Sequence, residues 1–165
     1  NLGDKFLDAT NIEVDLRKYV RLNSSSLLAF RLDGYFSWGK NPQLYWLGGD
    51  NTIRATEYRR LVGNNAVFFN AEFRFPLINF SSTILGFLGP VRGVLFFDVG
   101  GVWMNEEDFQ PFEKGKIKLK DAISSYGMGL NFFLFGYPVH LEWVHQTDFT
   151  ARKFYGVNFW IGFDF

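Results

Sequence analysis

The stretch that decides the fold is FYGVNFWIGFDF, residues 154–165, because it alternates without a break. Successive side chains of a β-strand point to opposite faces, so a period of two predicts a strand with two different faces. One face is mixed and carries Gly, Asn, Asp and two aromatic residues, with Phe154 among them. The other face is wholly apolar and consists of Tyr155, Val157, Phe159, Ile161, Phe163 and Phe165.

Six upstream segments show the same alternation over roughly ten residues each, which is the length a tilted strand needs to cross a bilayer. In the first of them, Ile12, Val14 and Leu16 alternate with charged residues. The six segments are residues 12–22, 27–38, 65–75, 93–103, 122–135 and 138–146. The sequence therefore predicts seven strands whose apolar faces need either lipid or a second sheet.

Composition supports lipid as that environment. Aromatic residues make up 20% of the chain and include 21 Phe, which is more than a soluble domain of 165 residues needs. The formal net charge is zero, which gives no reason to expect a nucleic-acid partner. The chain has no Cys, and this excludes disulfides and thiolate metal sites. It also lacks the run of about 18 apolar residues that a membrane-spanning helix requires.

The connections between the predicted strands fit an outer-membrane barrel, in which short periplasmic turns alternate with long extracellular loops. With the C-terminus placed at the periplasm, the extracellular connections are residues 39–64, 104–121 and 147–153. The periplasmic connections are then residues 23–26, 76–92 and 136–137. The two longest connections fall on the extracellular side. Residues 76–92 are long for a periplasmic turn, and we expect a short helix or an extended hairpin there.

Residues 45–77, YWLGGDNTIRATEYRRLVGNNAVFFNAEFRFPL, carry a family resemblance. They resemble the last long extracellular loop and the next strand of the outer-membrane barrel-assembly and polypeptide-translocating superfamily, also called the bacterial surface antigen family. The family pattern contains a hydrophobic-Arg-Gly-aromatic tetrad and a later Glu-x-Arg-Phe-Pro. Here the tetrad is Ile53, Arg54, Ala55 and Thr56, so the Arg matches while the Gly and the aromatic residue are replaced. Residues 94–103, 125–133 and 138–143 resemble later strands of the family.

The resemblance implies an all-β, antiparallel transmembrane barrel of the bacterial outer membrane, of roughly sixteen strands. Residues 1–11 would be an N-terminal segment or the end of an upstream strand, and residues 12–165 the last seven strands, with the long extracellular loop at 39–64. No enzymatic activity and no cofactor are implied. The expected partners are membrane lipid, upstream strands or an upstream domain, and client polypeptides. The apolar face of residues 154–165 would serve as the targeting signal for membrane insertion.

The function that the resemblance implies is assembly of outer-membrane proteins or translocation of polypeptides. A client strand would enter where the first and last strands of the barrel pair weakly. An alternative is a passive barrel that anchors or secretes an upstream passenger, such as a patatin-like or propeller-like domain. A soluble ligand-binding barrel ranks last, because its outer surface would be polar.

The candidate site consists of Arg54, Glu72 and Asp98. Glu72 and Asp98 fall on the polar faces of two consecutive strands, and neighbouring inward carboxylates need a cation. The planar fork of an Arg can serve two carboxylates better than a Lys can. The family's tetrad Arg is implied to contact the inner wall at these positions. We therefore predict an ion pair that pins the loop inside the barrel; the alternative is a solvated lumen surface.

Other candidate sites are weaker. His140 and His145 fall on opposite faces of one strand, so they cannot share a metal ion. Ser125, His140 and Glu142 could be imagined as a hydrolase triad on adjacent strands, but the ordinary polarity of a barrel lumen explains all three. Gly48 and Gly49 are followed by neither a Lys-Ser/Thr pair nor a helix, so they indicate loop turns rather than a phosphate site.

Overall fold

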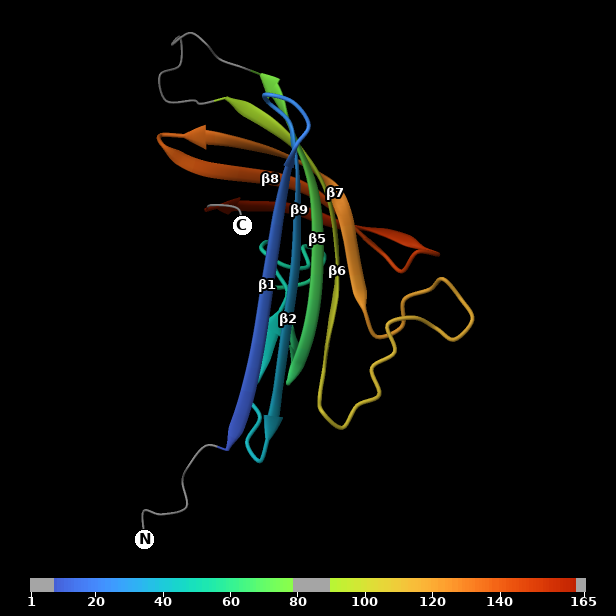
Figure 1. Cartoon of the computed structure of the whole chain (residues 1–165). Helices are drawn as coiled ribbons and strands as arrows, with labels where there is room; N and C mark the ends of the chain where they lie inside the picture. The colour runs from blue at the N-terminus through green and yellow to red at the C-terminus, as the bar shows by residue number, and fades with distance from the viewer. Residues whose placement is uncertain (1–7, 79–89, 163–165) are drawn as a thin grey trace.

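A computed structural model of the chain describes residues 8–78 and 90–162. Seven long strands form one antiparallel sheet in the order β1-β2-β5-β6-β7-β8-β9 (Figure 1). They are β1 (Ala9–Arg21), β2 (Leu27–Gly39), β5 (Asn65–Ile78), β6 (Val91–Trp103), β7 (Ile123–Leu134), β8 (Tyr137–Thr147) and β9 (Arg152–Ile161). Two short strands, β3 (Tyr45–Leu47) and β4 (Leu61–Gly63), pair with each other inside the loop between β2 and β5. The described part of the chain contains no helix long and apolar enough to cross a membrane.

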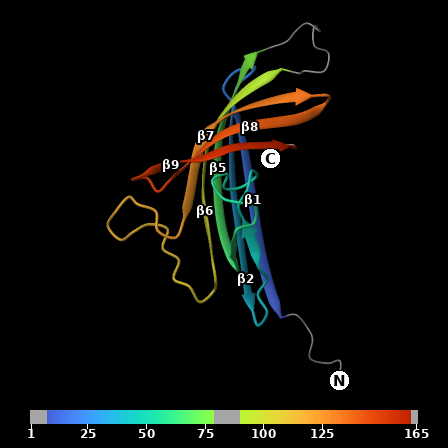
Figure 2. The same cartoon turned by 180° about the vertical axis from the view of Figure 1, so that it is seen from behind.

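The sheet is curved, and the loop of residues 40–64 lies on its concave side. β1, β2, β5 and β6 run nearly side by side, whereas β7, β8 and β9 cross behind them at a steep angle (Figures 1 and 2). All neighbouring long strands are antiparallel. This arrangement is an arc of barrel wall with its longest loop folded inward. The predicted all-β antiparallel fold is confirmed.

The two faces of the sheet differ sharply in polarity. Directly paired residues of neighbouring strands lie on the same face, so the pairing of Asn70 with Asp98 and of Asp98 with Ser125 places all three on the concave face. These three polar side chains are fully buried under the loop. On the convex face, Leu32 and Met128 are exposed at 43% and 58%. A polar interior and an apolar exterior are what a barrel surrounded by lipid requires.

An apolar cluster attaches the loop to the wall. It is made of Tyr35, Leu47, Ile53, Ala66 and Phe68, all buried. Ile53 approaches the wall closely, because a Cβ added at the facing glycine of β6 would lie 3.2 Å from the Ile53 Cδ1 atom. The loop is therefore packed like part of a domain core rather than extended into solvent.

Several strand bounds differ from the sequence-based expectations, and the largest differences are at β1 and β5. β1 begins at Ala9, three residues before the expected start, so it takes up the end of the segment assigned to residues 1–11. β5 continues to Ile78 and β6 begins at Val91, so strand fills both ends of the connection expected at residues 76–92. The helix or hairpin expected within that connection falls on residues 79–89, outside the described residues.

The prediction for Phe154 was wrong. A β-bulge between β8 and β9 pairs Val144 with Gly156 but His145 with Phe154, so Tyr155 is the extra residue. The bulge reverses the alternation, and Phe154 joins His145 on the outer face, where the two rings meet edge to face at 5.2 Å. Three residues of the predicted apolar face lie along β9 and are exposed: Val157 at 50%, Phe159 at 65% and Ile161 at 59%. Phe163 and Phe165 lie outside the described residues.

Candidate functional site

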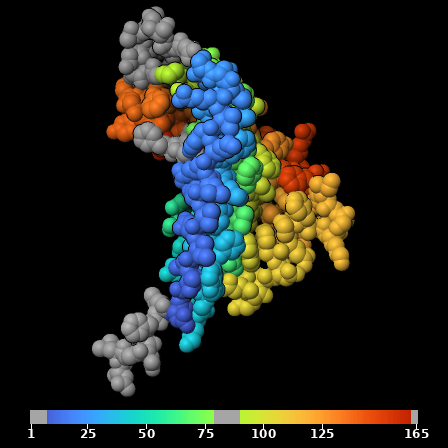
Figure 3. Space-filling model, viewed as in Figure 1, coloured from blue at the N-terminus to red at the C-terminus, as the bar shows by residue number. Residues whose placement is uncertain are grey.

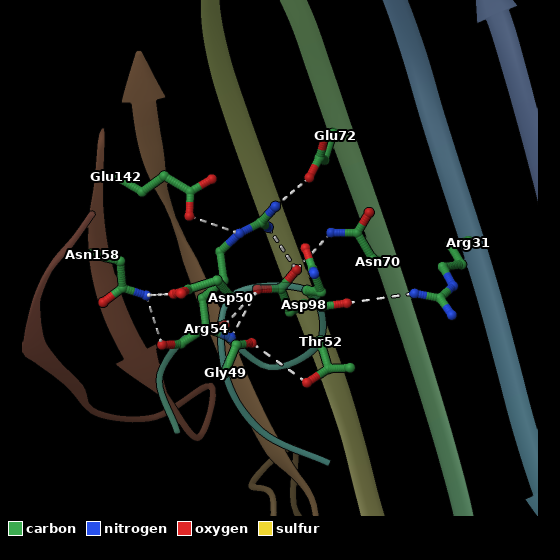
Figure 4. Close-up of polar contacts among 12 residues, drawn as sticks. Arg31, Gly49, Asp50, Thr52, Arg54, Asn70, Glu72, Asp98, Glu142 and Asn158 are labelled. Carbon is green, nitrogen blue, oxygen red and sulfur yellow. Dashed lines mark hydrogen bonds and ion pairs between the residues drawn. The ribbon is translucent and has the colours of Figure 1, made fainter. Parts of the chain in front are cut away.

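The guanidinium of Arg54 is buried at the centre of the concave face, where it contacts three carboxylates from three strands (Figure 4). Its Nη2 atom donates to Oε1 of Glu72 on β5, and its Nη1 atom donates to Oδ1 of Asp98 on β6 at 2.9 Å. Its Nε atom lies 3.0 Å from Oε2 of Glu142 on β8. The cation also sits 4.1 Å from the centre of the Phe96 ring. One Arg side chain therefore bonds the loop to a wide arc of the wall.

Additional donors support the carboxylates around Arg54. Arg74 on β5 contacts Oε2 of Glu72 through Nη2 at 2.7 Å. Asn70 donates to Oδ1 of Asp98 at 2.6 Å, and the Ser125 hydroxyl donates to Oδ2 at 2.8 Å. Burying charges is costly unless they are paired and hydrogen-bonded, and these contacts meet that condition for both carboxylates.

The last strand of the sheet is also connected to the loop. Asn158 on β9 donates from Nδ2 to Oδ1 of Asp50 at 2.8 Å and to the backbone oxygen of Arg54 at 3.2 Å (Figure 4). Asn158 is the direct cross-strand partner of Glu142. The loop thus contacts β5, β6, β8 and β9 through side-chain hydrogen bonds and ion pairs around one residue.

A tight turn presents Arg54 to the wall. Gly48 and Gly49 have φ values of 122° and 99°, which favour glycine. A Cβ added at Gly48 would lie 2.3 Å from a backbone oxygen of the same loop. The Gly49 amide donates to the Thr56 carbonyl at 2.9 Å, and Thr52 Oγ1 accepts from the Gly48 amide at the same distance. These bonds close the turn and hold the tetrad in place.

All four tetrad residues are buried. Ile53 belongs to the apolar cluster that attaches the loop, and Arg54 forms the ion pairs. Ala55 packs with Phe96 of β6 and with a valine of β8. Thr56, at 6% exposure, accepts the turn-closing bond from Gly49. The tetrad is therefore the part of the loop that meets the inner wall.

Sequence reasoning missed the contributions of Glu142 and Asn158 to this site. From the sequence, Glu142 is a candidate only as a member of a hydrolase triad, and Asn158 is only one member of a mixed strand face. Both are polar residues at inward positions of their strands, and that was the available signal. Their convergence on Arg54 depends on the stagger between strands, which the alternation pattern of a single sequence does not reveal.

The three residues of the imagined triad do not form a catalytic arrangement. Ser125 donates to Asp98, and Glu142 faces Arg54. His140 makes a 2.8 Å contact from Nε2 to the Gly162 carbonyl, and its ring stacks on an indole of β9 at 3.7 Å. Among residues 8–78 and 90–162, no group of three His, Asp or Glu side chains is placed to hold a metal ion.

A family model described as the Omp85 superfamily domain matches residues 2–165. No curated protein matches the chain at a significant level. The matched range includes every strand of the sheet and the whole of the loop that carries Arg54.

Proposed function

The chain belongs to the Omp85 superfamily, and on that premise we propose that it forms wall strands of a barrel that assembles outer-membrane proteins or translocates polypeptides. Members of this superfamily are non-enzymatic β-barrels of the bacterial outer membrane, where upstream POTRA domains and client proteins accompany them. The outer-membrane location is shared by this chain. Its clients and its own upstream region belong to the proposal.

The observation that carries the proposal is the position of Arg54 among Glu72, Asp98 and Glu142. These contacts hold the loop against the concave face, in the space that would be the lumen of a closed barrel. A lumen occupied by a bonded loop is not an open channel. This supports a gated barrel over a permanently open pore, because the loop and its ion pairs must be displaced before a polypeptide can pass through the lumen.

In the proposed mechanism, the loop holds β9 from its inner face while the edge of β9 receives a client strand. β9 lies at one edge of the sheet, and an unpaired strand edge is a template for further pairing. Asn158 fixes the inner face of β9 to the loop, so its strand direction stays defined when its edge partner changes. In this view the ion-pair network is a positioning device for the edge strand.

We also propose an orientation for the wall. The ends of β2 and β6 at Gly39 and Trp103 face the outside of the cell, and the turn between β7 and β8 faces the periplasm. In this orientation the loop that carries Arg54 enters the lumen from the extracellular side. The outward residues of β9 belong to the segment that the insertion machinery reads, together with Phe163 and Phe165.

Depletion of the full-length protein in its own host tests the function. If the proposal holds, unrelated outer-membrane barrels lose abundance in the membrane and accumulate unfolded in the periplasm. Re-expression of the wild type should restore them, whereas the Arg54→Ala variant should restore them less well. Barrel levels that stay normal while a single surface or secreted protein disappears would instead support the passive anchor.

The passive anchor remains the second candidate for one reason. Ala55 and Thr56 stand where the family pattern has Gly and an aromatic residue. Substitution of both residues to the family pattern provides the test. Improved client assembly would indicate a weakened translocase, and an unchanged outcome in both client assembly and passenger display would leave the two residues without a role in either.

A further inference from the structure

The loop between β6 and β7, residues 104–122, lies against the outer face of the wall. Gly101 and Trp103 of β6 share the outward face with Phe97, because they are separated by even numbers of residues. The Phe109 ring stacks on Trp103 at 4.3 Å. A Cβ added at Gly101 would lie only 2.7 Å from the Phe109 ring. The ring therefore rests directly on the strand backbone, on the side that faces lipid.

A second line of aromatic contacts extends this surface away from the wall. Phe149, at the tip of the β8–β9 hairpin, stacks with the outward Phe97 at 6.2 Å and with Phe112 of the loop at 6.2 Å. The Leu119 amide donates to the Asp148 carbonyl at 3.0 Å, which fixes the loop to the hairpin tip. In Figure 3 the loop forms a lobe that stands out beside the strands. Its apolar surface is thus continuous with the lipid-facing wall.

The lobe exposes apolar and basic side chains together. Ile117 is 80% exposed, and Phe112 and Phe149 are 46% and 42% exposed. Residues 114–120 read KGKIKLK, so Lys114, Lys116, Lys118 and Lys120 alternate with small or apolar residues. Acids of the loop lie on both sides of this segment, and three of them are engaged locally: Glu107 caps a backbone amide, Asp108 accepts from a Gln side chain, and Asp121, which follows the segment, accepts from a backbone amide at 2.8 Å.

Glu113 organises two of the four lysines. Its carboxylate accepts from Lys116 at 2.8 Å and from Lys118 at 2.6 Å. These hydrogen bonds lower the pKa of the Glu113 carboxyl to about 2, so it remains ionised at neutral pH. Two ammonium groups are thereby held side by side, and residues 113–120 carry four Lys against one Glu. The segment keeps a positive charge beside an exposed apolar side chain.

We propose that the outer shelf, defined as residues 109–120 together with Phe149, binds phosphate-bearing lipid headgroups at the surface of the membrane. Ile117 and Phe112 would enter the boundary between headgroups and acyl chains, while the lysines meet the phosphates. Apolar side chains next to lysines on a surface continuous with the lipid-facing wall fit an anionic membrane surface. The inference rests on the barrel's location in the membrane and is independent of the proposed client-handling role. The leaflet concerned is the extracellular one in the orientation proposed above.

A fluorescent probe attached at Ile117→Cys tests the shelf. The substitution is introduced into the full-length protein as its sole cysteine, and the protein is reconstituted in mixed phosphatidylcholine and phosphatidylglycerol bilayers. Bromine on the acyl chains of one lipid or the other quenches the probe only where that lipid touches it. The same probe at Tyr58→Cys, a 77% exposed position in the loop of residues 40–64, is the control.

Both brominated lipids should quench the Ile117 probe, and the brominated phosphatidylglycerol should do so more strongly. Each lysine near an anionic surface contributes on the order of a fivefold local enrichment. Changing the four lysines to Gln should therefore abolish the difference between the lipids, and Lys114→Gln alone should reduce it. Equal quenching by both lipids in the wild type would refute headgroup recognition. Quenching by aqueous iodide alone, as expected for the Tyr58 probe, would refute the seating of the shelf in lipid.

Discussion

Replacing Arg54 by Ala removes the one cation that contacts Glu72, Asp98 and Glu142 together. Removing one partner of a buried ion pair costs about 3 to 5 kcal/mol, because the remaining charge stays desolvated without its partner. Asp98 keeps two side-chain donors and Glu72 keeps Arg74, so we expect a loss near the lower end of that range. Arg54→Lys should recover only part of it, since an ammonium group cannot serve three carboxylates with the geometry of a guanidinium.

Denaturation of the full-length barrel in lipid vesicles, followed by tryptophan fluorescence, measures this loss. The matched control is Arg17→Ala on β1. The Arg17 side chain is 43% exposed and pairs with Asp15 at 2.7 Å, so its removal should cost less than about 1 kcal/mol. A second variant, Arg54→Ala with Asp98→Asn, should regain stability because one uncompensated charge is gone. Equal stability losses for Arg54→Ala and Arg17→Ala would refute the reasoning.

Three further predictions concern the wall and one external turn. Near the middle of the bilayer, Leu130→Arg should cost about 2 to 4 kcal/mol of stability, which is more than Asn131→Arg should cost on the lumen face. Denaturation of both variants measures this, and equal losses of stability would refute the assignment of faces. Gly127→Ala should cost about 1 to 3 kcal/mol of stability, because the added Cβ would lie 2.0 Å from a backbone oxygen of β8. Gly156→Ala should be near neutral, because its added Cβ would have no atom within 4 Å. Thermal denaturation of the two variants measures the difference. Hydrogen bonds from two backbone amides and a hydroxyl of its turn lower the pKa of the Asp148 carboxyl from 3.8 to about 2. Its stabilising contribution is therefore complete above pH 3.8 and is lost as the pH falls through 2; a carboxyl NMR titration with a midpoint near 3.8 would contradict this.

The sequence was informative about the faces of the strands because lipid imposes a strict rule. Every second side chain must be apolar on the membrane side, so the outward positions of Leu32 and Met128 followed from alternation alone. Strand ends were less certain, since residues beyond the hydrocarbon can be polar whether they are in a strand or in a turn. The start of β1 at Ala9 and the end of β5 at Ile78 are of this kind.

The bulge at Tyr155 could not be predicted from the pattern. A bulge inserts one residue into a ladder without changing composition, and the residues on both sides of this one are aromatic or small, so either register looks acceptable. The placement of Phe154 on the wrong face follows directly from that. The family match, by contrast, agrees with the resemblance recognised around Arg54.

The residues of the candidate site also differ in how far the sequence could predict them. Glu72 and Asp98 could be paired with Arg54 because they lie on strands adjacent in sequence and because the family resemblance pointed there. Glu142 and Asn158 belong to strands beyond β7, and their approach to Arg54 depends on how strongly the sheet curves. Curvature arises from the accumulated twist and tilt of many strands, which no local pattern reports.

The accessibility of a single thiol tests most directly whether Arg54 holds its loop inside the barrel lumen. Ala55 is 4% exposed and Tyr58 is 77% exposed, only three residues apart in the same loop. In intact cells, a membrane-impermeant thiol reagent should label Tyr58→Cys readily and Ala55→Cys hardly at all. Adding Arg54→Ala should make Ala55→Cys reactive. Rapid labelling of Ala55→Cys while Arg54 is present would contradict the account.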